Sequence, residues 1–352
     1  MADIDTAPER ARERVGSSEE QPAAWSATNG GGAEGITRRL GIVQLDAIDA
    51  AVRATEGRET TTITRADFGA PEITALMDAA RYDIIQGRGA VLLSGIDISR
   101  YSVDQFARIH FGLGAHLGRA AEQSERHDRI GYVRKEPNPE KRGYLSDTEL
   151  GPHTDYHGIL SLASVVTSEE GGVSGFVSAA AVYDVIRRER PDLLEALEEG
   201  YYYPTGLDSV TDYKVPTFSV IDGHIGVYAY VLFIVRAAMI RGEPVPAKFV
   251  EALRFFNTVA RRPELMASFT MQPGEIAYWH NFRVLHSRTS FRNTPGRERL
   301  LLRLWLHPRD HFPLAKGFYE ISDILDQQHA QGFSMVGNTE ELLRGAYELM
   351  RG

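Results

Sequence analysis

Cysteine is absent from the 352-residue sequence. Its absence excludes a disulfide scaffold, a thiolate metal site, an iron–sulfur cluster and a cysteine nucleophile, so any bound metal must use His, Asp or Glu. Basic residues are outnumbered, with 39 Lys and Arg against 48 Asp and Glu. Because a nucleic-acid partner requires a basic face, this balance argues against nucleic acid and favours a small-molecule partner.

Long apolar stretches are also missing, although 43% of the residues are hydrophobic. No run approaches the ~20 residues that a membrane span requires, and the N-terminal segment 1–16 lacks the apolar stretch of a signal peptide. We therefore expect a cytoplasmic protein with no membrane partner. The sequence leaves the oligomeric state open, and a homo-oligomer is one alternative.

Residues 1–37 carry acids, arginines and a run of glycines but few periodic apolar positions. Such a segment buries too little surface to offset the entropy of ordering, which predicts a disordered N-terminal tail. Residues 38–352 show no repeat and no linker, so we expect them to form a single domain.

Apolar periodicity in this domain predicts a mainly β fold with flanking helices. Helical spacing runs from Pro71 to the Gly87 break, and a capping box at Ser102 begins a second helix. Further helices are expected at 191–199 and around 249–259, and strands at 90–93, 130–133, 158–166, 173–177, 201–203, 218–221, 225–230, 267–271, 275–279 and 300–306.

His153 and Asp155 directly precede an apolar strand. In an extended chain, residues two apart point to the same face, so the two side chains form a chelating pair. An imidazole nitrogen and a carboxylate oxygen suit a divalent first-row metal, and a third ligand from a distant His would complete a facial triad with open positions. A hydrogen-bonded pair on the surface is the alternative for this motif taken alone.

His286 is the candidate third ligand, because it follows a turn and a strand and lies at a strand end. Beyond it, strand alternation over 299–306 places Arg299 and Arg303 on one face and four leucines on the other. If the arginine face lines the interior, each guanidinium needs an anion, and a dicarboxylate would bind one of them bidentately. An exposed edge strand with acidic partners is the alternative.

Taken in order, these motifs resemble the taurine dioxygenase and 2,4-dichlorophenoxyacetate dioxygenase family of Fe(II)/2-oxoglutarate-dependent oxygenases, within the clavaminate synthase-like superfamily. The resemblance covers about residues 60 to 310. The set that carries it is His153-x-Asp155, Gly-Gly-Val-Ser at 171–174, Pro-Gly-Glu-Ile-Ala-Tyr-Trp at 273–279, His286, and Arg299-x-x-x-Arg303.

The resemblance implies a double-stranded β-helix, or cupin-like jelly roll, that binds Fe(II), 2-oxoglutarate and O2. It implies Fe(II) ligation by His153, Asp155 and His286, which would be the catalytic centre. Arg299 matches the position that binds the distal carboxylate of 2-oxoglutarate. Ser174 falls where the family has a Thr or Ser hydroxyl after a Gly-Gly break.

The resemblance also implies candidate substrate residues. Arg303 matches a position that several relatives turn toward an acidic substrate group or the other carboxylate of 2-oxoglutarate. Tyr228 and Tyr230 lie on a predicted strand where relatives contact substrate, with a core position as the alternative for each. His157 shares the strand face of Asp155, so it is either a substrate contact or a histidine that faces solvent.

Some features depart from the family pattern. The interval before Ser174 is short, which leaves Ser178 as its rival for the cofactor hydroxyl. Arg297 also lies within the permitted distance of His286, and we prefer Arg299 because it falls on the inward register of the last strand. His280 stands where relatives often carry an acid, and we expect it to be a hydrogen-bonded histidine at a strand end.

The resemblance implies hydroxylation of a small or medium-sized acidic or amino-acid-like substrate, with release of succinate and CO2. Desaturation, cyclisation and epimerisation start from the same chemistry and stay open as outcomes. The carboxylate at Asp155 favours oxygenation over halogenation. A zinc hydrolase or a non-catalytic jelly-roll binding protein are the other classes weighed, and both leave the two arginines and the Gly-Gly-x-Ser break without a role.

Overall fold

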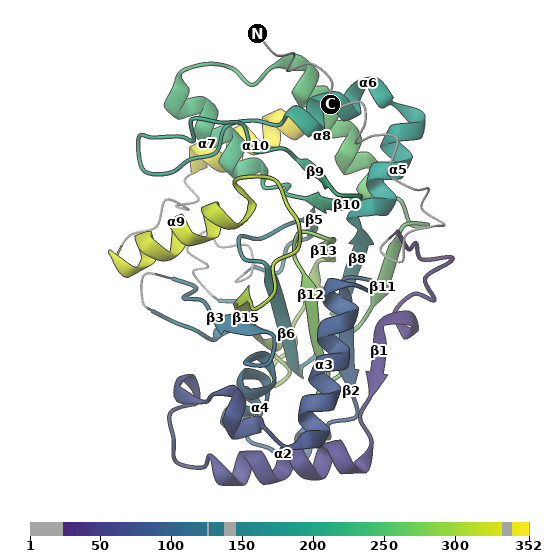
Figure 1. Cartoon of the computed structure of the whole chain (residues 1–352), viewed down its shortest axis with the longest axis vertical. Coiled ribbons are helices and arrows are strands. Elements are labelled where there is room, and N and C mark those ends of the chain that lie inside the picture. The colour runs from purple at the N-terminus through teal and green to yellow at the C-terminus, as the bar shows by residue number, and fades with distance from the viewer. Residues whose placement is uncertain (1–23, 125–126, 137–145, 333–339, 352) are drawn as a thin grey trace.

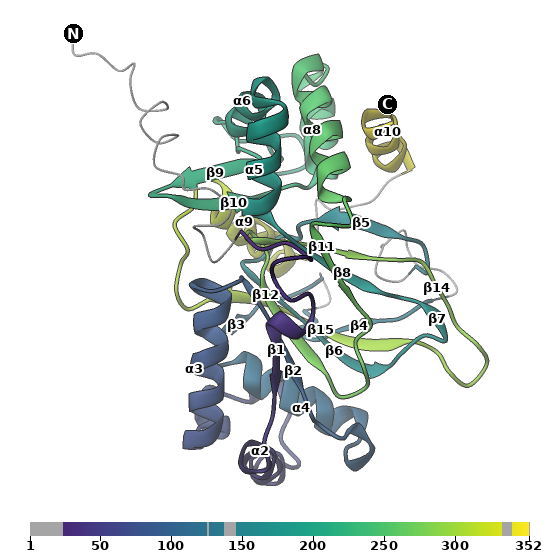
Figure 2. The ribbon, with the colours of Figure 1, turned by 90° about the vertical axis from the view of Figure 1, so that its right-hand side faces the viewer.

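The structure is a computed structural model, and it describes residues 24–124, 127–136, 146–332 and 340–351. Within these residues the β strands occupy the middle of the molecule (Figures 1 and 2). One group of helices, from the N-terminal part of the chain, lies at one end of the strands, and a second group lies at the other end.

The larger sheet contains seven strands among the described residues, in the order β1-β2-β12-β6-β15-β3, with β4 paired to β15. The β1–β2 pair is parallel and the other pairs of this sheet are antiparallel. Its strands are β1 (Thr37–Arg39), β2 (Ala90–Ser94), β3 (Gly118–Ala120), β4 (Gly131–Val133), β6 (Ile159–Val166), β12 (Ile276–His280) and β15 (Leu300–Pro308).

The smaller sheet has the order β11-β8-β13-β5 and is antiparallel throughout. The hairpin of β9 and β10 and the two-residue pair of β7 with β14 extend the strand region. These strands are β5 (Leu150–His153), β7 (Glu170–Gly171), β8 (Ser174–Ser178), β9 (Phe218–Ile221), β10 (His224–Val227), β11 (Met266–Phe269), β13 (Val284–Arg288) and β14 (Phe291–Arg292).

The helices divide between the two ends of the strands (Figure 1). The first group is α2 (Ile42–Ala54), α3 (Pro71–Ile85) and α4 (Val103–Gly114). The second group is α5 (Ala179–Glu189), α6 (Pro191–Glu199), α7 (Val231–Arg241), α8 (Ala247–Ala260) and α10 (Glu340–Met350), and α9 (Phe318–Ala330) lies beside the strand region. Among the described residues, we find no helix with both the length and the apolar character that crossing a bilayer requires.

Strand β15 separates two hydrophobic cores. Leu302, Leu304 and Leu306 point to the core that α3 and α4 cover. Leu301 and Trp305 point to the other core, together with residues of β8 and β13. This alternation is the predicted one, and it places Arg299 and Arg303 on the inner side of the sheet, where they are 4% and 7% exposed. The alternative of an exposed edge strand is therefore wrong.

The prediction that residues 1–37 form a disordered tail is wrong for residues 24–37. Residues 1–23 lie outside the described residues, but Trp25 and Ile36 are buried in the core. The indole of Trp25 donates a hydrogen bond to the carbonyl of Arg88, at 2.7 Å, and Thr37 begins β1 beside β2. Two isolated apolar residues and one short strand are thus enough to fix a segment whose average composition predicts disorder.

Two predicted strands differ from the observed ones. The predicted strand 225–230 ends at Val227, and Tyr230 is the N-cap of α7, so Tyr228 and Tyr230 lie after the strand. The predicted strand 201–203 is a single bridge from Tyr201 to Val215. The sequence analysis did not predict α2, α7, α9 or α10. Helix α7 begins after Tyr230 without a side-chain cap, and so carried no local signal of its start.

Candidate active site

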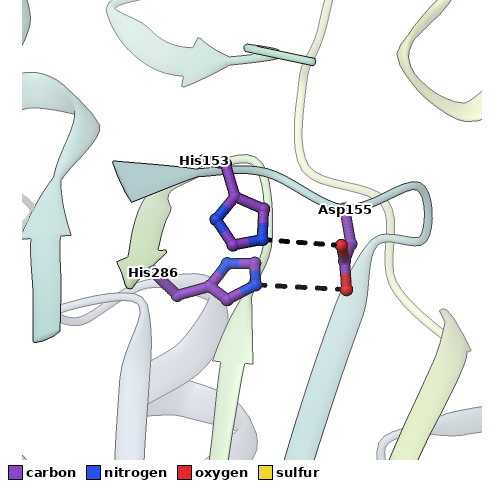
Figure 3. A group of neighbouring side chains, drawn as sticks. All are labelled: His153, Asp155 and His286. Carbon is purple, nitrogen blue, oxygen red and sulfur yellow. Dashed lines mark ion pairs between the residues drawn. The ribbon is translucent and has the colours of Figure 1, made fainter. Parts of the chain in front are cut away.

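His153, Asp155 and His286 converge at the ends of β5 and β13 (Figure 3). Nε2 of His153 lies 3.8 Å from Oδ1 of Asp155, and Nε2 of His286 lies 4.0 Å from Oδ2. The two imidazole rings lie beside each other, with centroids 4.2 Å apart. One ligand atom from each residue lies within 4.8 Å of the others, so the three side chains suit one metal ion.

The backbone around the site explains this convergence. His153 and His286 are directly paired in the β5–β13 ladder, which brings residues 133 positions apart into register. The side chain of Asn281 then fixes the turn after β5, because its Oδ1 accepts from the backbone N–H of Asp155 and its Nδ2–H donates to the carbonyl of Asp155. Nδ1 of His153 hydrogen-bonds the carbonyl of Gly151 at 2.8 Å, which leaves Nε2 for a metal.

The electrostatics of the three residues also suit a cation. Burial opposes ionisation of Asp155, but His286, His153 and Arg303 outweigh it and hold the pKa of this carboxyl below its ordinary value. Burial, followed by the neighbouring His153, lowers the pKa of His286 to about 3. At neutral pH the site therefore holds a carboxylate and a neutral imidazole at His286, the protonation states that bind metal.

Arg299 lies in a buried pocket beside the Gly-Gly turn. Its guanidinium packs against Phe291, 5.1 Å from the ring centre, and Nη1 is buried without a hydrogen-bond partner among the described residues. A Cβ at Gly172 would lie 3.2 Å from Nε of Arg299, and Gly172 has a φ of +68°, so a larger residue would both strain the turn and crowd the arginine. This explains why the break carries glycine.

Arg288 is a second guanidinium in this region, and the sequence analysis missed it. It lies two residues beyond His286 on β13 and packs on the same Phe291, at 4.8 Å. Burial, then repulsion from Arg288, lowers the pKa of Arg299 to about 9, which shows that the two positive charges interact. The period of two on β13 was the available signal for Arg288.

Arg297 and Ser178, the alternative candidates for binding the cofactor, have other surroundings. Arg297 is exposed, and its Nη2 donates to the Thr167 hydroxyl at 3.2 Å. Ser178 is the N-cap of α5, where its Oγ accepts from the N–H of Ala181. Ser174 is buried on β8, directly opposite Arg288 in the ladder with β13. The structure thus gives Arg297 and Ser178 other environments and leaves Ser174 beside the arginine pocket.

Arg303 lies on the inner face of β15, on the metal-site side of the sheet. Its Nε donates to Oε1 of Gln123 at 2.7 Å, and Nε2 of Gln123 donates to the Arg303 carbonyl at 2.8 Å. Its guanidinium carbon lies 4.1 Å from the ring centre of Trp305. Arg303 is close enough to Asp155 to stabilise that carboxylate. Gln123 carried no sequence signal, since its role depends on the pairing of β3 and β4 with β15.

The tyrosines form a cluster next to Asp155. The hydroxyl of Tyr156 donates to the hydroxyl of Tyr230 at 2.5 Å, and their rings meet edge to face. Tyr230 is half-buried. Tyr228 is fully buried among Tyr203, Phe282 and other aromatic rings, and its hydroxyl has no partner among the described residues.

The two remaining histidines of the sequence analysis are both buried. His157 does not face solvent, because its Nε2 hydrogen-bonds Oδ1 of Asp326 at 3.0 Å and its ring stacks on Trp305. His280 ends β12, and its Nδ1 accepts from the N–H of Phe282. Burial holds the pKa of His280 well below its ordinary value, so it is a neutral hydrogen-bonded histidine at a strand end, as predicted.

Two mainly antiparallel sheets with a site of two histidines and one carboxylate are typical of mononuclear non-haem iron oxygenases. A family model described as "Taurine catabolism dioxygenase TauD, TfdA family" matches residues 55–305. The match covers more than half of the chain, so the chain belongs to this family. The predicted recognition and the predicted enzyme class, an Fe(II)/2-oxoglutarate-dependent dioxygenase, are confirmed at this level.

Two curated relatives share moderate similarity with the chain. FR-33289 synthase of Streptomyces rubellomurinus (strain ATCC 31215) is 24% identical over 237 residues, which is 63% of this chain and 69% of that protein. The taurine hydroxylase-like protein SAT17 of Stachybotrys chartarum (strain CBS 109288 / IBT 7711) is 25% identical over 301 residues, or 80% of this chain and 77% of that protein.

Solved structures confirm the predicted jelly-roll fold. Asparagine oxygenase in complex with Fe(II), 2S,3S-3-hydroxyasparagine and succinate has a TM-score of 0.60 at 14% identity, over 77% of this chain and 93% of that one. The non-haem iron oxygenase OrfP in complex with Fe and alpha-ketoglutaric acid has a TM-score of 0.55 at 14% identity, over 77% and 94%.

Proposed function

We propose that this chain oxidises a small, acidic, amino-acid-like substrate and that His153, Asp155 and His286 hold its Fe(II). The observation that supports this best is the convergence of the three ligand atoms within 4.8 Å. Arg299, which is buried and whose Nη1 has no partner among the described residues, adds a group that can bind an anion. Fe(II) in such a site supplies O2 activation, which couples decarboxylation of 2-oxoglutarate to succinate and CO2 with oxidation of a substrate C–H bond.

Arg299 and Ser174 would bind 2-oxoglutarate. A carboxylate beside Arg299 gains a charge-assisted pair of hydrogen bonds, and it also relieves the repulsion between Arg299 and Arg288. The cost of burying two guanidiniums so close together falls when an anion enters. Arg288 therefore adds to the positive potential of this pocket, although the family motifs do not include it.

Arg303 would bind an anionic group of the substrate. Gln123 and the indole of Trp305 hold its guanidinium in place on the inner face of the sheet. Arg299 directly precedes β15 and lies four residues before Arg303, about 13 Å at ~3.3 Å per residue, which is too far for both to bind one end of the same molecule. Tyr230 and Tyr156 offer an aromatic wall and hydroxyls beside Asp155, which suits a small acid or amino acid.

The roles of the other candidates follow from their surroundings. Tyr228 offers a buried hydroxyl, and its aromatic neighbours give it a packing role that supports Tyr230. His157 is engaged with Asp326, so we assign it to the support of the site through Trp305 instead of to the substrate. The structures of asparagine oxygenase with 3-hydroxyasparagine and of OrfP with dihydroxy-L-Arg agree with an amino-acid-like substrate.

Anaerobic titration tests the cofactor assignment. Addition of Fe(II) and then 2-oxoglutarate to the purified chain should develop the metal-to-ligand charge-transfer band of the chelated 2-oxo acid, which a zinc hydrolase or a binding protein would not show. A screen of small acids and amino acids for succinate release then identifies the substrate. The absence of both the band and succinate with Fe(II) loaded would exclude the proposed function.

The role of Arg303 is tested by separating coupled from uncoupled turnover. Arg303→Ala should weaken substrate-dependent succinate formation more than the slow decay of 2-oxoglutarate without substrate. Equal loss of both activities would assign Arg303 to 2-oxoglutarate. Productive oxidation of a substrate without any anionic group, unchanged in Arg303→Ala, would contradict an acidic substrate.

A further inference from the structure

The indole of Trp305 makes a direct contact with a candidate metal ligand. Its Nε1–H donates a hydrogen bond to Oδ2 of Asp155, at 3.1 Å. Trp305 is 4% exposed and lies on the inner face of β15, in the same register as Arg303.

This hydrogen bond distinguishes the two oxygens of Asp155. Oδ2 accepts from the indole and lies 4.0 Å from Nε2 of His286, whereas Oδ1 lies 3.8 Å from Nε2 of His153. A carboxylate with one oxygen engaged in this way offers the other oxygen to a metal. One-oxygen ligation matters in a site of two histidines and one carboxylate, because a second bound oxygen would occupy a position that 2-oxoglutarate or O2 needs.

We propose that Trp305 is the positioning residue that holds Asp155 in a one-oxygen binding mode. This inference rests on the proposed function, since it assumes that Asp155 binds the metal. Partners of this kind, which orient a ligand without touching the metal, typically contribute about 10- to 100-fold to metal affinity. Trp305 therefore joins the metal site as a determinant of its open coordination.

The indole is itself fixed from a distant part of the chain. The ring of His157 stacks on it with centroids 5.2 Å apart and an angle of 21° between the planes. His157 is held by Asp326 of α9, which also accepts a hydrogen bond from His307 at 2.6 Å. A continuous series of contacts thus runs from α9 to Asp155, and it leaves the indole little freedom to turn away.

A matched pair of tryptophan variants tests the proposal. Trp305→Phe removes the N–H but keeps an aromatic ring, and we expect Fe(II) to bind about 10- to 100-fold more weakly in anaerobic titrations. Trp279→Phe is the control, because Trp279 is also buried next to a candidate ligand, 5.0 Å from the His286 ring, but its Nε1 has no partner among the described residues. It should bind Fe(II) as the parent chain does.

Co(II) gives a readout that is independent of turnover. Its visible absorption bands report the coordination number, so they should change in Trp305→Phe, where both oxygens of Asp155 become available, and not in Trp279→Phe. Unchanged Fe(II) affinity and unchanged Co(II) bands in Trp305→Phe would overturn the inference while leaving the proposed function intact. Equal weakening in both variants would also overturn it, because ring volume would then be the cause.

Folding and the proposed function are controlled separately. Both variants should still unfold in one cooperative thermal transition, lowered in each case because the smaller ring leaves a cavity. If Trp305→Phe does not fold, the benzothiophene analogue of tryptophan at position 305 replaces the N–H by sulfur at nearly constant shape, and the same weakening is expected. Failure of the parent chain to bind Fe(II) would instead reject the proposed function itself.

Discussion

Two groups of two histidines and one aspartate occur in the described part of the chain, and they differ in how tightly they are closed. In the candidate metal site, the imidazole nitrogens lie 3.8 and 4.0 Å from the carboxylate oxygens of Asp155. In the second group, His157 and His307 lie 3.0 and 2.6 Å from Asp326. The first separations exceed hydrogen-bond length, whereas the second are hydrogen bonds.

The surroundings of Asp155 and Asp326 also favour a metal at Asp155 and disfavour one at Asp326. Asp326 already accepts two hydrogen bonds and has the guanidinium of Arg119 at 3.7 Å, which opposes a cation. Burial disfavours its charge, but the hydrogen bonds from His157 and His307 outweigh burial and lower its pKa. The same three residue types therefore make an open ligand set in one place and a closed link between α9 and the sheet in the other.

The largest expected effect separates the two groups by metal binding. The parent chain should bind one equivalent of Fe(II) in anaerobic titrations, and His153→Ala, Asp155→Ala or His286→Ala should each abolish both binding and turnover without unfolding the protein, since these residues lie around a partly open site. Two equivalents in the parent chain would show that the second group also binds metal. Near-normal succinate formation in any of the three variants would remove that residue from the site.

The next effect concerns the buried arginines. Arg299→Ala should raise the apparent KM for 2-oxoglutarate about ten- to a hundredfold, because a charge-assisted contact contributes roughly 1.5 to 3 kcal/mol. Arg297→Ala is the control, since Arg297 is exposed, and it should change KM little. Steady-state kinetics at varied 2-oxoglutarate measure both. A larger rise in KM for Arg297→Ala than for Arg299→Ala would mean that Arg297, and not Arg299, binds 2-oxoglutarate.

A smaller effect on stability is expected at the second group. Asp326→Asn should lower the free energy of unfolding by about 1 to 3 kcal/mol, because it weakens two hydrogen bonds to a charged acceptor. Asp323→Asn is a matched control on α9: its carboxylate is 67% exposed and 4.0 Å from His307. Denaturant titration compares the two. Equal stability of both variants would argue that the link to α9 contributes nothing.

The smallest effect near neutral pH is a pH dependence outside both groups. His110 is fully buried against the Ser161 hydroxyl, and burial lowers its pKa to about 3. The unfolded chain takes up this proton near pH 6.5, so the contribution of His110 is complete above that pH and is lost as pH falls from about 6.5 toward 3. The slope is at most about 1.4 kcal/mol per pH unit.

Two histidine variants check this slope. His110→Gln should flatten the acid limb of the stability curve, measured by denaturant titration at several pH values. His127→Gln should leave it unchanged, because the His127 side chain is 57% exposed. A curve for His110→Gln that parallels the parent chain would show that other buried groups dominate the acid limb.

Period-two alternation and short motifs predicted most of the β core and the candidate metal ligands. The alternation in β15 placed Arg299 and Arg303 inside, and the His-x-Asp pair predicted that two ligands share a face. Both depend on local backbone geometry, which a sequence encodes directly. Local patterns did not predict the structure of segment 24–37, because Trp25 is held by a hydrogen bond to the distant Arg88 carbonyl.

The sequence by itself determined the residue types of this site and the strand faces that carry them, since chemistry and periodicity are local properties. Only the tertiary structure decided that His153 and His286 are paired, that Arg288 repels Arg299, and that Trp305 holds one oxygen of Asp155. It also decided that Asp155 stays open to a metal, whereas Asp326 of α9 is closed by hydrogen bonds with His157 and His307. These distinctions arise from contacts between segments more than a hundred residues apart, or between side chains brought together by strand pairing, and no local pattern specifies them.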